Sequence, residues 1–153
     1  MLPRRTAALA VALALLMPGT ALAGMSRAEQ VLLFKMNEVR AQHGLPPLRF
    51  DAHLQRAARA HSREMLTDGV FEHGAFDLRM IEFNVRGQVT GENIAWGTGL
   101  LGTPSEIFDE WIASPEHRAN ILRPSFTRVG VGDLIGVFLG HEGSHMVTAD
   151  FAG

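Results

Sequence analysis

Apolar residues recur with a helical period in the first half of the chain and gather in strand-like runs near its end. The first periodic stretch predicts a helix that begins at the capping box Ser26-x-x-Glu29 and ends at Gly44, which Pro46-Pro47 follows. In a capping box each side chain binds a free backbone N–H of the first turn, so this signal fixes the helix start. The apolar stripe of this helix consists of Val31, Leu32, Met36 and Val39.

A second helix is predicted from Asp51, which serves as its N-cap, to about Thr67, with Gly69 as the stop signal. One face of it carries Leu54, Ala58, His61 and Met65. A histidine on an apolar stripe is best interpreted as a buried core residue that is hydrogen-bonded to backbone. A short third helix is expected over residues 76–84.

A fourth helix is predicted at Thr103-Pro104-x-Glu106, where a capping box coincides with proline at the first helical position. Ser114-Pro115 ends this helix and caps another short helical turn. The core-facing residues of the fourth helix are Ile107, Phe108, Trp111 and Ile112.

Strand-like residues dominate after Pro124. Runs over 129–139 and 146–151 predict a hairpin with its turn at 140–144, and residues 89–96 predict a further strand. Helices that precede strands in this way indicate an α+β fold in which helices pack on a small antiparallel sheet.

Residues 1–23 have the pattern of a signal peptide. Arg4-Arg5 precede an apolar run over 7–17, and Ala21-Leu22-Ala23 forms a small-x-small cleavage pattern before Gly24. The run is shorter than the roughly 20 residues that a membrane span needs. We therefore expect a secreted or periplasmic protein whose mature chain is one domain over 24–153, with no transmembrane segment after signal removal.

The net charge and the absence of cysteine exclude some classes of function. Removal of residues 1–23 takes away two of the 14 basic residues, which leaves 12 against 16 acidic residues and a net charge of −4. Without a basic cluster, nucleic acid is not expected as a partner. The chain has no cysteine, so disulfides and thiol chemistry are excluded and the core alone must stabilise the domain.

Three particular segments follow one another in the second half: Gly91-Glu-Asn-Ile-Ala95, Trp111-Ile-Ala-Ser-Pro-Glu-His-Arg-Ala-Asn-Ile-Leu122 and His145-Met-Val-Thr-Ala-Asp-Phe151. Upstream lie Asn37-x-x-Arg40, His43-Gly-Leu-Pro-Pro-Leu48 and Ala57-Ala-Arg-Ala-His-Ser62. With these segments the chain, from about Glu29 to Phe151, resembles the CAP superfamily of cysteine-rich secretory, antigen 5 and pathogenesis-related 1 proteins, and within it the short, cysteine-free bacterial branch.

The resemblance implies a three-layer α-β-α sandwich with a shallow cleft lined by two histidines and two acidic residues. By motif these are His73, Glu92 and His145, while Ser114 stands where the family has its second acid. Glu110 or Glu116 could supply that acid, although neither stands at the family position.

Two imidazoles with a nearby carboxylate suit a weakly held divalent cation such as zinc, with His73 and His145 as its ligands. We expect these residues to converge on one open cleft. The alternative is that both histidines are ordinary surface residues and the cleft is a polar groove without metal. His117 is expected to play a structural role at the short helical turn.

A second chemical signal is the pattern His141-Glu142-x-x-His145, which matches a zinc-protease motif. That motif requires a helix, so that both histidines share one face. Gly140 and Gly143, with strand-like runs on both sides, favour a turn instead.

The sequence therefore predicts a secreted, non-enzymatic binding module that requires no cofactor. As the resemblance implies, its ligand would be a lipid-like or sterol-like small hydrophobic molecule or a partner protein. The alternative function is a zinc-dependent secreted hydrolase or peptidase.

Overall fold

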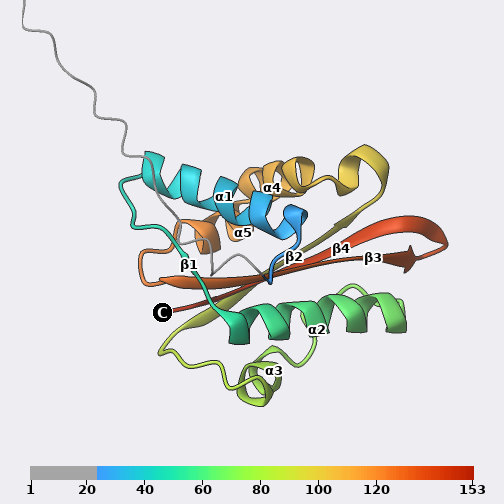
Figure 1. The fold of residues 1–153 in the computed structure, drawn as a ribbon, viewed down its shortest axis with the longest axis horizontal. Coiled ribbons are helices and arrows are strands. Elements are labelled where there is room, and N and C mark those ends of the chain that lie inside the picture. Colours follow the sequence, from blue (N-terminus) through green and yellow to red (C-terminus); the bar gives the residue numbers. More distant parts are fainter. Residues whose placement is uncertain (1–23) are drawn as a thin grey trace, which may run out of the picture.

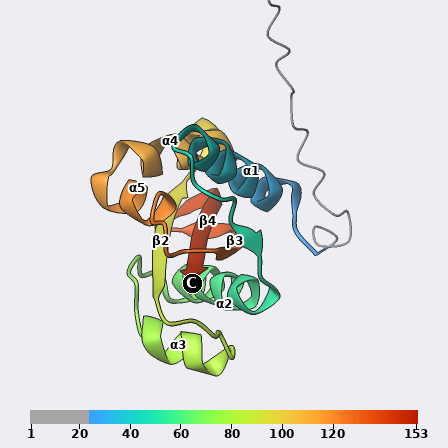
Figure 2. The same ribbon diagram turned by 90° about the vertical axis from the view of Figure 1, so that its left-hand side faces the viewer.

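The computed structural model describes residues 24–153, so the predicted signal peptide lies outside the described residues. A four-stranded sheet forms the middle of three layers (Figure 1 and Figure 2), with α1, α4 and α5 on one face and α2 and α3 on the other. The helices are α1 (Arg27–Gln42), α2 (Ala52–Asp68), α3 (Phe76–Glu82), α4 (Pro104–Ala113) and α5 (Pro115–Ile121), with the 3₁₀ turn η1 at Gly99–Gly102. The strands are β1 (Arg49–Phe50), β2 (Thr90–Gly97), β3 (Arg128–Phe138) and β4 (His141–Ala152). The predicted α-β-α sandwich is confirmed.

The sheet has the order β1-β3-β4-β2, which leaves β2 at one edge. β4 pairs antiparallel with both β3 and β2, as predicted. The sheet that we predicted as antiparallel is mixed, because the two-residue strand β1 pairs parallel with β3. So short a strand has no periodicity for the sequence to reveal.

The hairpin turn is tighter than predicted. It comprises Leu139 and Gly140, whose φ angles are +49° and +84°, and β4 already begins at His141. Two consecutive residues with positive φ match the twist of a two-residue hairpin, and glycine adopts this conformation without strain. Gly143, which we expected in the turn, lies within β4.

The predicted N-caps Ser26, Asp51 and Thr103 are confirmed, whereas Ser114 makes no side-chain capping bond and Thr103 forms only one of the two bonds of a capping box. Ser26 and Glu29 form both hydrogen bonds of the capping box, Asp51 accepts from the backbone N–H groups of His53 and Leu54, and the Thr103 hydroxyl accepts from Glu106 N at 3.4 Å. Glu29 also extends into the protein, where its carboxylate binds Arg59 with a shortest separation of 2.6 Å. The start of α1 is thereby tied to α2.

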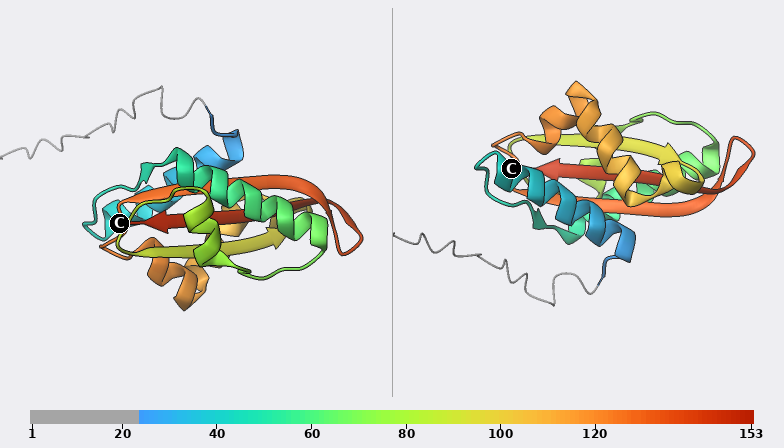
Figure 3. Two further views of the ribbon diagram at one scale, coloured as in Figure 1. Left: turned by 90° about the horizontal axis from the view of Figure 1, so that it is seen from below. Right: turned by 90° about the horizontal axis from the view of Figure 1, so that it is seen from above.

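Helices cover both faces of the sheet (Figure 3). Clusters of buried apolar residues form the core of the domain. Trp111, Ile107 and Phe126 belong to the larger core beneath α1 and α4. On the other face α2 approaches β3 so closely that Cβ atoms at Gly130 and Gly132 would lie 2.0 Å and 2.5 Å from backbone nitrogens of α2. No helix within residues 24–153 is long and apolar enough to cross a membrane.

Candidate functional site

Glu92 lies on the edge strand β2 with its side chain 3% exposed. One carboxylate oxygen accepts a hydrogen bond from His73 Nδ1 at 2.7 Å, and the other is bound by the guanidinium of Arg79. Arg79 extends from α3, is 6% exposed, and also reaches the carbonyl of His73 at 3.4 Å. The charge of the buried carboxylate is therefore compensated, and its position is fixed from both sides.

His73 lies in the loop between α2 and α3, and its side chain is 58% exposed. Since Nδ1 faces Glu92, the ring keeps its Nε2 directed away from that bond, with no hydrogen bond to residues 24–153. A carboxylate on one nitrogen of a histidine orients the ring and makes the other nitrogen a better ligand. The expected pairing of His73 with Glu92 is present.

His61, on α2, holds the loop between α2 and α3 by a hydrogen bond. It is 1% exposed, and its Nε2 bonds the carbonyl oxygen of Glu72 at 2.9 Å. This confirms the prediction of a buried histidine that is hydrogen-bonded to backbone. Because Glu72 immediately precedes His73, His61 helps to set the position of the exposed ring.

His117, for which we predicted only a structural role, is the residue that sequence reasoning missed. It lies on α5, near enough to His73 for the charges of the two rings to interact. Its Nδ1 is buried and has no hydrogen-bond partner within residues 24–153. Burial lowers the pKa of His117, an effect opposed by Glu110, so the neutral ring with a free nitrogen is favoured.

The position of His117 is fixed by two asparagines. Asn93 donates to the carbonyl of His117 at 3.0 Å, and Asn120 donates both to Asn93 Oδ1 at 2.9 Å and to the carbonyl of Glu92 at 3.1 Å. This network ties α5 to the edge of β2. We call His73, Arg79, Glu92 and His117 the edge site. The sequence signal for His117 was its place in the distinctive Trp111–Leu122 segment, which also carries Asn120.

His145 does not join the edge site, so the expected convergence of three residues was wrong. Glu92 pairs with Asp150 across β2 and β4, whereas His145 pairs with Gly97. Five residues along a strand span roughly 16 Å. His145 Nδ1 instead contacts both oxygens of Asp133, at 2.9 and 3.1 Å. Within residues 24–153 no group of three or more histidine, aspartate or glutamate side chains is placed to hold a metal.

Ser114, at the position of the second family acid, and the two candidate replacements Glu110 and Glu116 differ in their surroundings. Ser114 joins α4 to α5 and makes no side-chain capping bond. Glu110 and Glu116 are exposed, and both act on His117 by raising its pKa against the larger effect of burial. Glu110 therefore supplies the negative charge near His117 that Ser114 cannot supply, although it forms no ion pair within residues 24–153.

The zinc-protease pattern lies in a strand. His141 to His145 form the start of β4, with His141 beside the Trp96 ring at a centroid distance of 6.2 Å. Residues four apart on a strand are separated by roughly 13 Å, which is too far for two ligands of one zinc ion. The geometry required by the hydrolase alternative is therefore absent here.

Asp150 lies beneath the edge site, fully buried, and neither of its carboxyl oxygens has a hydrogen-bond partner within residues 24–153. Burial raises the pKa of Asp150 well above its ordinary value, the Glu92 carboxylate raises it further, and Arg79 opposes both effects. The buried site therefore favours the protonated, uncharged form of the Asp150 carboxyl.

Replacing Asp150 by Asn should stabilise the protein at neutral pH. The folded-state pKa lies above the unfolded value, so the wild type is most stable below the unfolded pKa and loses stability as pH rises towards the folded pKa. The neutral amide cannot ionise, so it removes this loss of stability. Urea unfolding between pH 4 and 8 measures it, with the exposed Asp109→Asn as control. Equal pH slopes for Asp150→Asn and wild type would contradict the assignment.

The structure is that of an α+β domain with a cluster of polar side chains, the edge site, at the edge of its sheet. The model of the cysteine-rich secretory protein family, CAP, matches residues 33–136, and the chain belongs to this family.

Individual relatives agree with this assignment. The Bacillus subtilis protein YkwD is 38% identical over 114 residues, which cover 71% of this chain and 43% of YkwD. The structure of an extracellular protein containing an SCP domain from Bacillus anthracis superposes with a TM-score of 0.70 and 28% identity, covering 82% of this chain and 40% of that one. An outer surface protein from Borrelia burgdorferi has the same fold (TM-score 0.70, 17% identity, 81% and 90% coverage). The chain spans less than half the length of YkwD.

Proposed function

We propose that the chain is an exported, non-enzymatic binding module that binds its ligand at the edge site, with a weakly held divalent cation as one ligand. The observation that carries this proposal is the His73–Glu92 bond, which leaves an exposed ring with one nitrogen free. His117 adds a second imidazole, whose lowered pKa favours the neutral ring and whose buried Nδ1 has no hydrogen-bond partner within residues 24–153. The Glu92 carboxylate is occupied by His73 and Arg79, so it suits orientation of a ligand better than transfer of a proton.

Two histidine nitrogens fit zinc or a similar borderline cation, with water completing the shell. Two protein ligands make a weak site, since closed structural zinc sites use four. Affinity should fall below about pH 6, where protons compete with the metal for the imidazoles.

Calorimetric titration with zinc tests this site. We expect wild type to bind one ion, and His73→Ala and His117→Ala each to lose at least about tenfold in affinity. His145→Ala is the matched control, because His145 lies further along the sheet and contacts Asp133. Loss of binding in His145→Ala alone, or equal binding in all variants, would remove the edge site from consideration.

A second candidate ligand, a small hydrophobic molecule, is supported by a different cavity. A space of about 560 Å³ lies beside α4, with Trp96, Leu101 and Ala113 among its lining residues. This volume is in the range of small-molecule sites. Glu106, Asp109 and Glu110 also line it, so electrostatics favours a neutral, sterol-like molecule over a fatty acid anion.

Native mass spectrometry of protein exported by its own host tests the hydrophobic ligand. We expect a retained mass in wild type that is lost when Ala113→Trp fills the cavity, while Ala119→Trp, at an exposed position on α5, keeps it. An unliganded wild type, or equal retention in both variants, would count against this ligand.

A further inference from the structure

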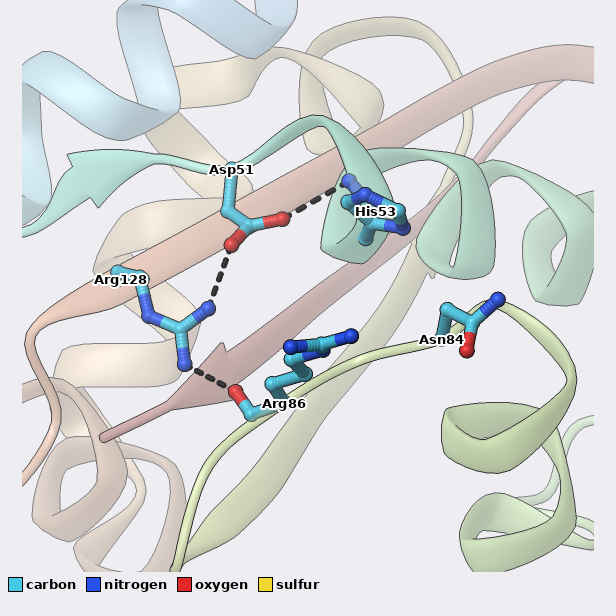
Figure 4. A pocket seen from close by; sticks show the side chains of 5 residues that line it. All are labelled: Asp51, His53, Asn84, Arg86 and Arg128. Carbon is cyan, nitrogen blue, oxygen red and sulfur yellow. Dashed lines mark hydrogen bonds and ion pairs between the residues drawn. The ribbon is translucent and has the colours of Figure 1, made fainter.

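A polar pocket of about 300 Å³ lies at the opposite end of α2 from the hairpin turn. It is lined by Asp51, His53, Asn84, Arg86 and Arg128, and we call it the arginine pocket (Figure 4). Its walls come from the start of α2, the segment that follows α3 and the start of β3. None of these residues belongs to the edge site.

The pocket has more positive than negative charge. Arg128 Nη1 binds Asp51 Oδ2 at 2.6 Å, and its other terminal nitrogen binds the backbone carbonyl of Arg86. Asp51 is therefore already engaged, since its second oxygen caps α2. Arg86 has no acidic partner within residues 24–153, and Arg56, whose guanidinium lies 3.0 Å from His53 Nδ1, has none there either. The two arginines that line the pocket, against the one aspartate, leave a surplus of one positive charge.

Hydrogen-bond donors face the same space. The Arg86 side chain points into the pocket between Arg128 and His53 (Figure 4). His53 Nδ1 bonds the carbonyl of Phe83 at 2.8 Å, so the ring is held in place and Nε2 remains free. Asn84, which has a left-handed φ of +55°, brings its amide to the pocket wall.

We propose that the arginine pocket binds a phosphoryl group, in the form of a phosphate monoester. Guanidinium groups present paired donors that match phosphate oxygens, and the net positive charge of the pocket suits an anionic group. The volume exceeds that of the phosphate alone and leaves room for a small organic group attached to it. A free metabolite-sized phosphate and a phospholipid head group share this chemistry.

Titration with glycerol 3-phosphate, followed by NMR, tests the pocket with a soluble probe. We expect saturable shifts at the residues of the pocket, and at least about tenfold weaker binding in Arg86→Gln. Because the Arg86 side chain is exposed and makes no hydrogen bond within residues 24–153, this variant should fold normally. Arg27→Gln is the matched control, an exposed arginine on α1 with the same loss of charge.

Sedimentation with vesicles distinguishes the two sources of the phosphoryl group. Binding to phosphatidic acid vesicles but not to phosphatidylcholine vesicles, with dependence on Arg86, would assign the pocket to a lipid head group. Binding of glycerol 3-phosphate without vesicle binding would assign it to a soluble ester. Absence of binding in both experiments, or equal weakening by Arg86→Gln and Arg27→Gln, overturns the proposal.

Discussion

Replacing Gly130 by Ala is expected to destabilise the protein by at least about 3 kcal/mol, because overpacking against a rigid neighbour is costly. A Cβ at this position would lie 2.0 Å from Gln55 N and 2.1 Å from Leu54 C. Both are backbone atoms of α2, so no side-chain rotation relieves the clash and the helix must move away from the sheet. Urea unfolding measures the loss.

Gly136→Ala is the matched control for this prediction. It lies on the same strand, but its added methyl would meet the flexible side chain of Leu66, with a nearest approach of 3.1 Å. We expect a change within about 1 kcal/mol, partly offset by the lower entropy of the unfolded chain. If Gly130→Ala unfolds at the same urea concentration as Gly136→Ala, close packing of α2 on β3 is not what stabilises this layer.

Replacing Arg40 by Met should cost about 3–5 kcal/mol, the range found when a buried polar partner is removed. Arg40 is 1% exposed on α1, and burial lowers its pKa. Its guanidinium donates to the carbonyl oxygens of Pro46, Ile121, Arg123 and Phe126 at 2.8–3.1 Å. The variant leaves these four acceptors without their donor, which is the larger part of the cost.

Arg40→Lys should lose less than Arg40→Met, because an ammonium group can still donate to some of these carbonyls. Arg27→Met, at an exposed position of the same helix, should change stability by about 0.5 kcal/mol or less. A loss in Arg27→Met similar to that in Arg40→Met would mean that the helix propensity of α1, and not the carbonyl cluster, accounts for the effect.

Local signals located the helices well. The capping box at Ser26, the caps at Asp51 and Thr103 and the stop at Gly69 act over three or four residues, so each can be recognised without knowledge of the rest of the fold. The hairpin turn was misplaced because the glycine at 143 resembles the turn glycine at 140, and only the strand pairing separates them.

Part of the edge site, His73 and Glu92, could be predicted from the sequence. The motif around Glu92 and the loop histidine His73 indicated a pair that the structure brings to 2.7 Å. His145 was assigned by matching its segment to the family motif, yet the register of β4 on β2 places it opposite Gly97. His117 was overlooked because α5 reaches the edge of β2 only through the Asn93–Asn120 network.

By itself the sequence determined the family, the helices and their caps, the hairpin strands and the pairing of His73 with Glu92. These features depend on short-range periodicity, capping and motif, which are properties of neighbouring residues. Tertiary structure alone decided the parallel strand β1, the place of His117 and the burial of Asp150 beneath Glu92. These depend on strand register and on contacts between segments far apart in the chain, because a shift of one residue in register exchanges the faces of a strand.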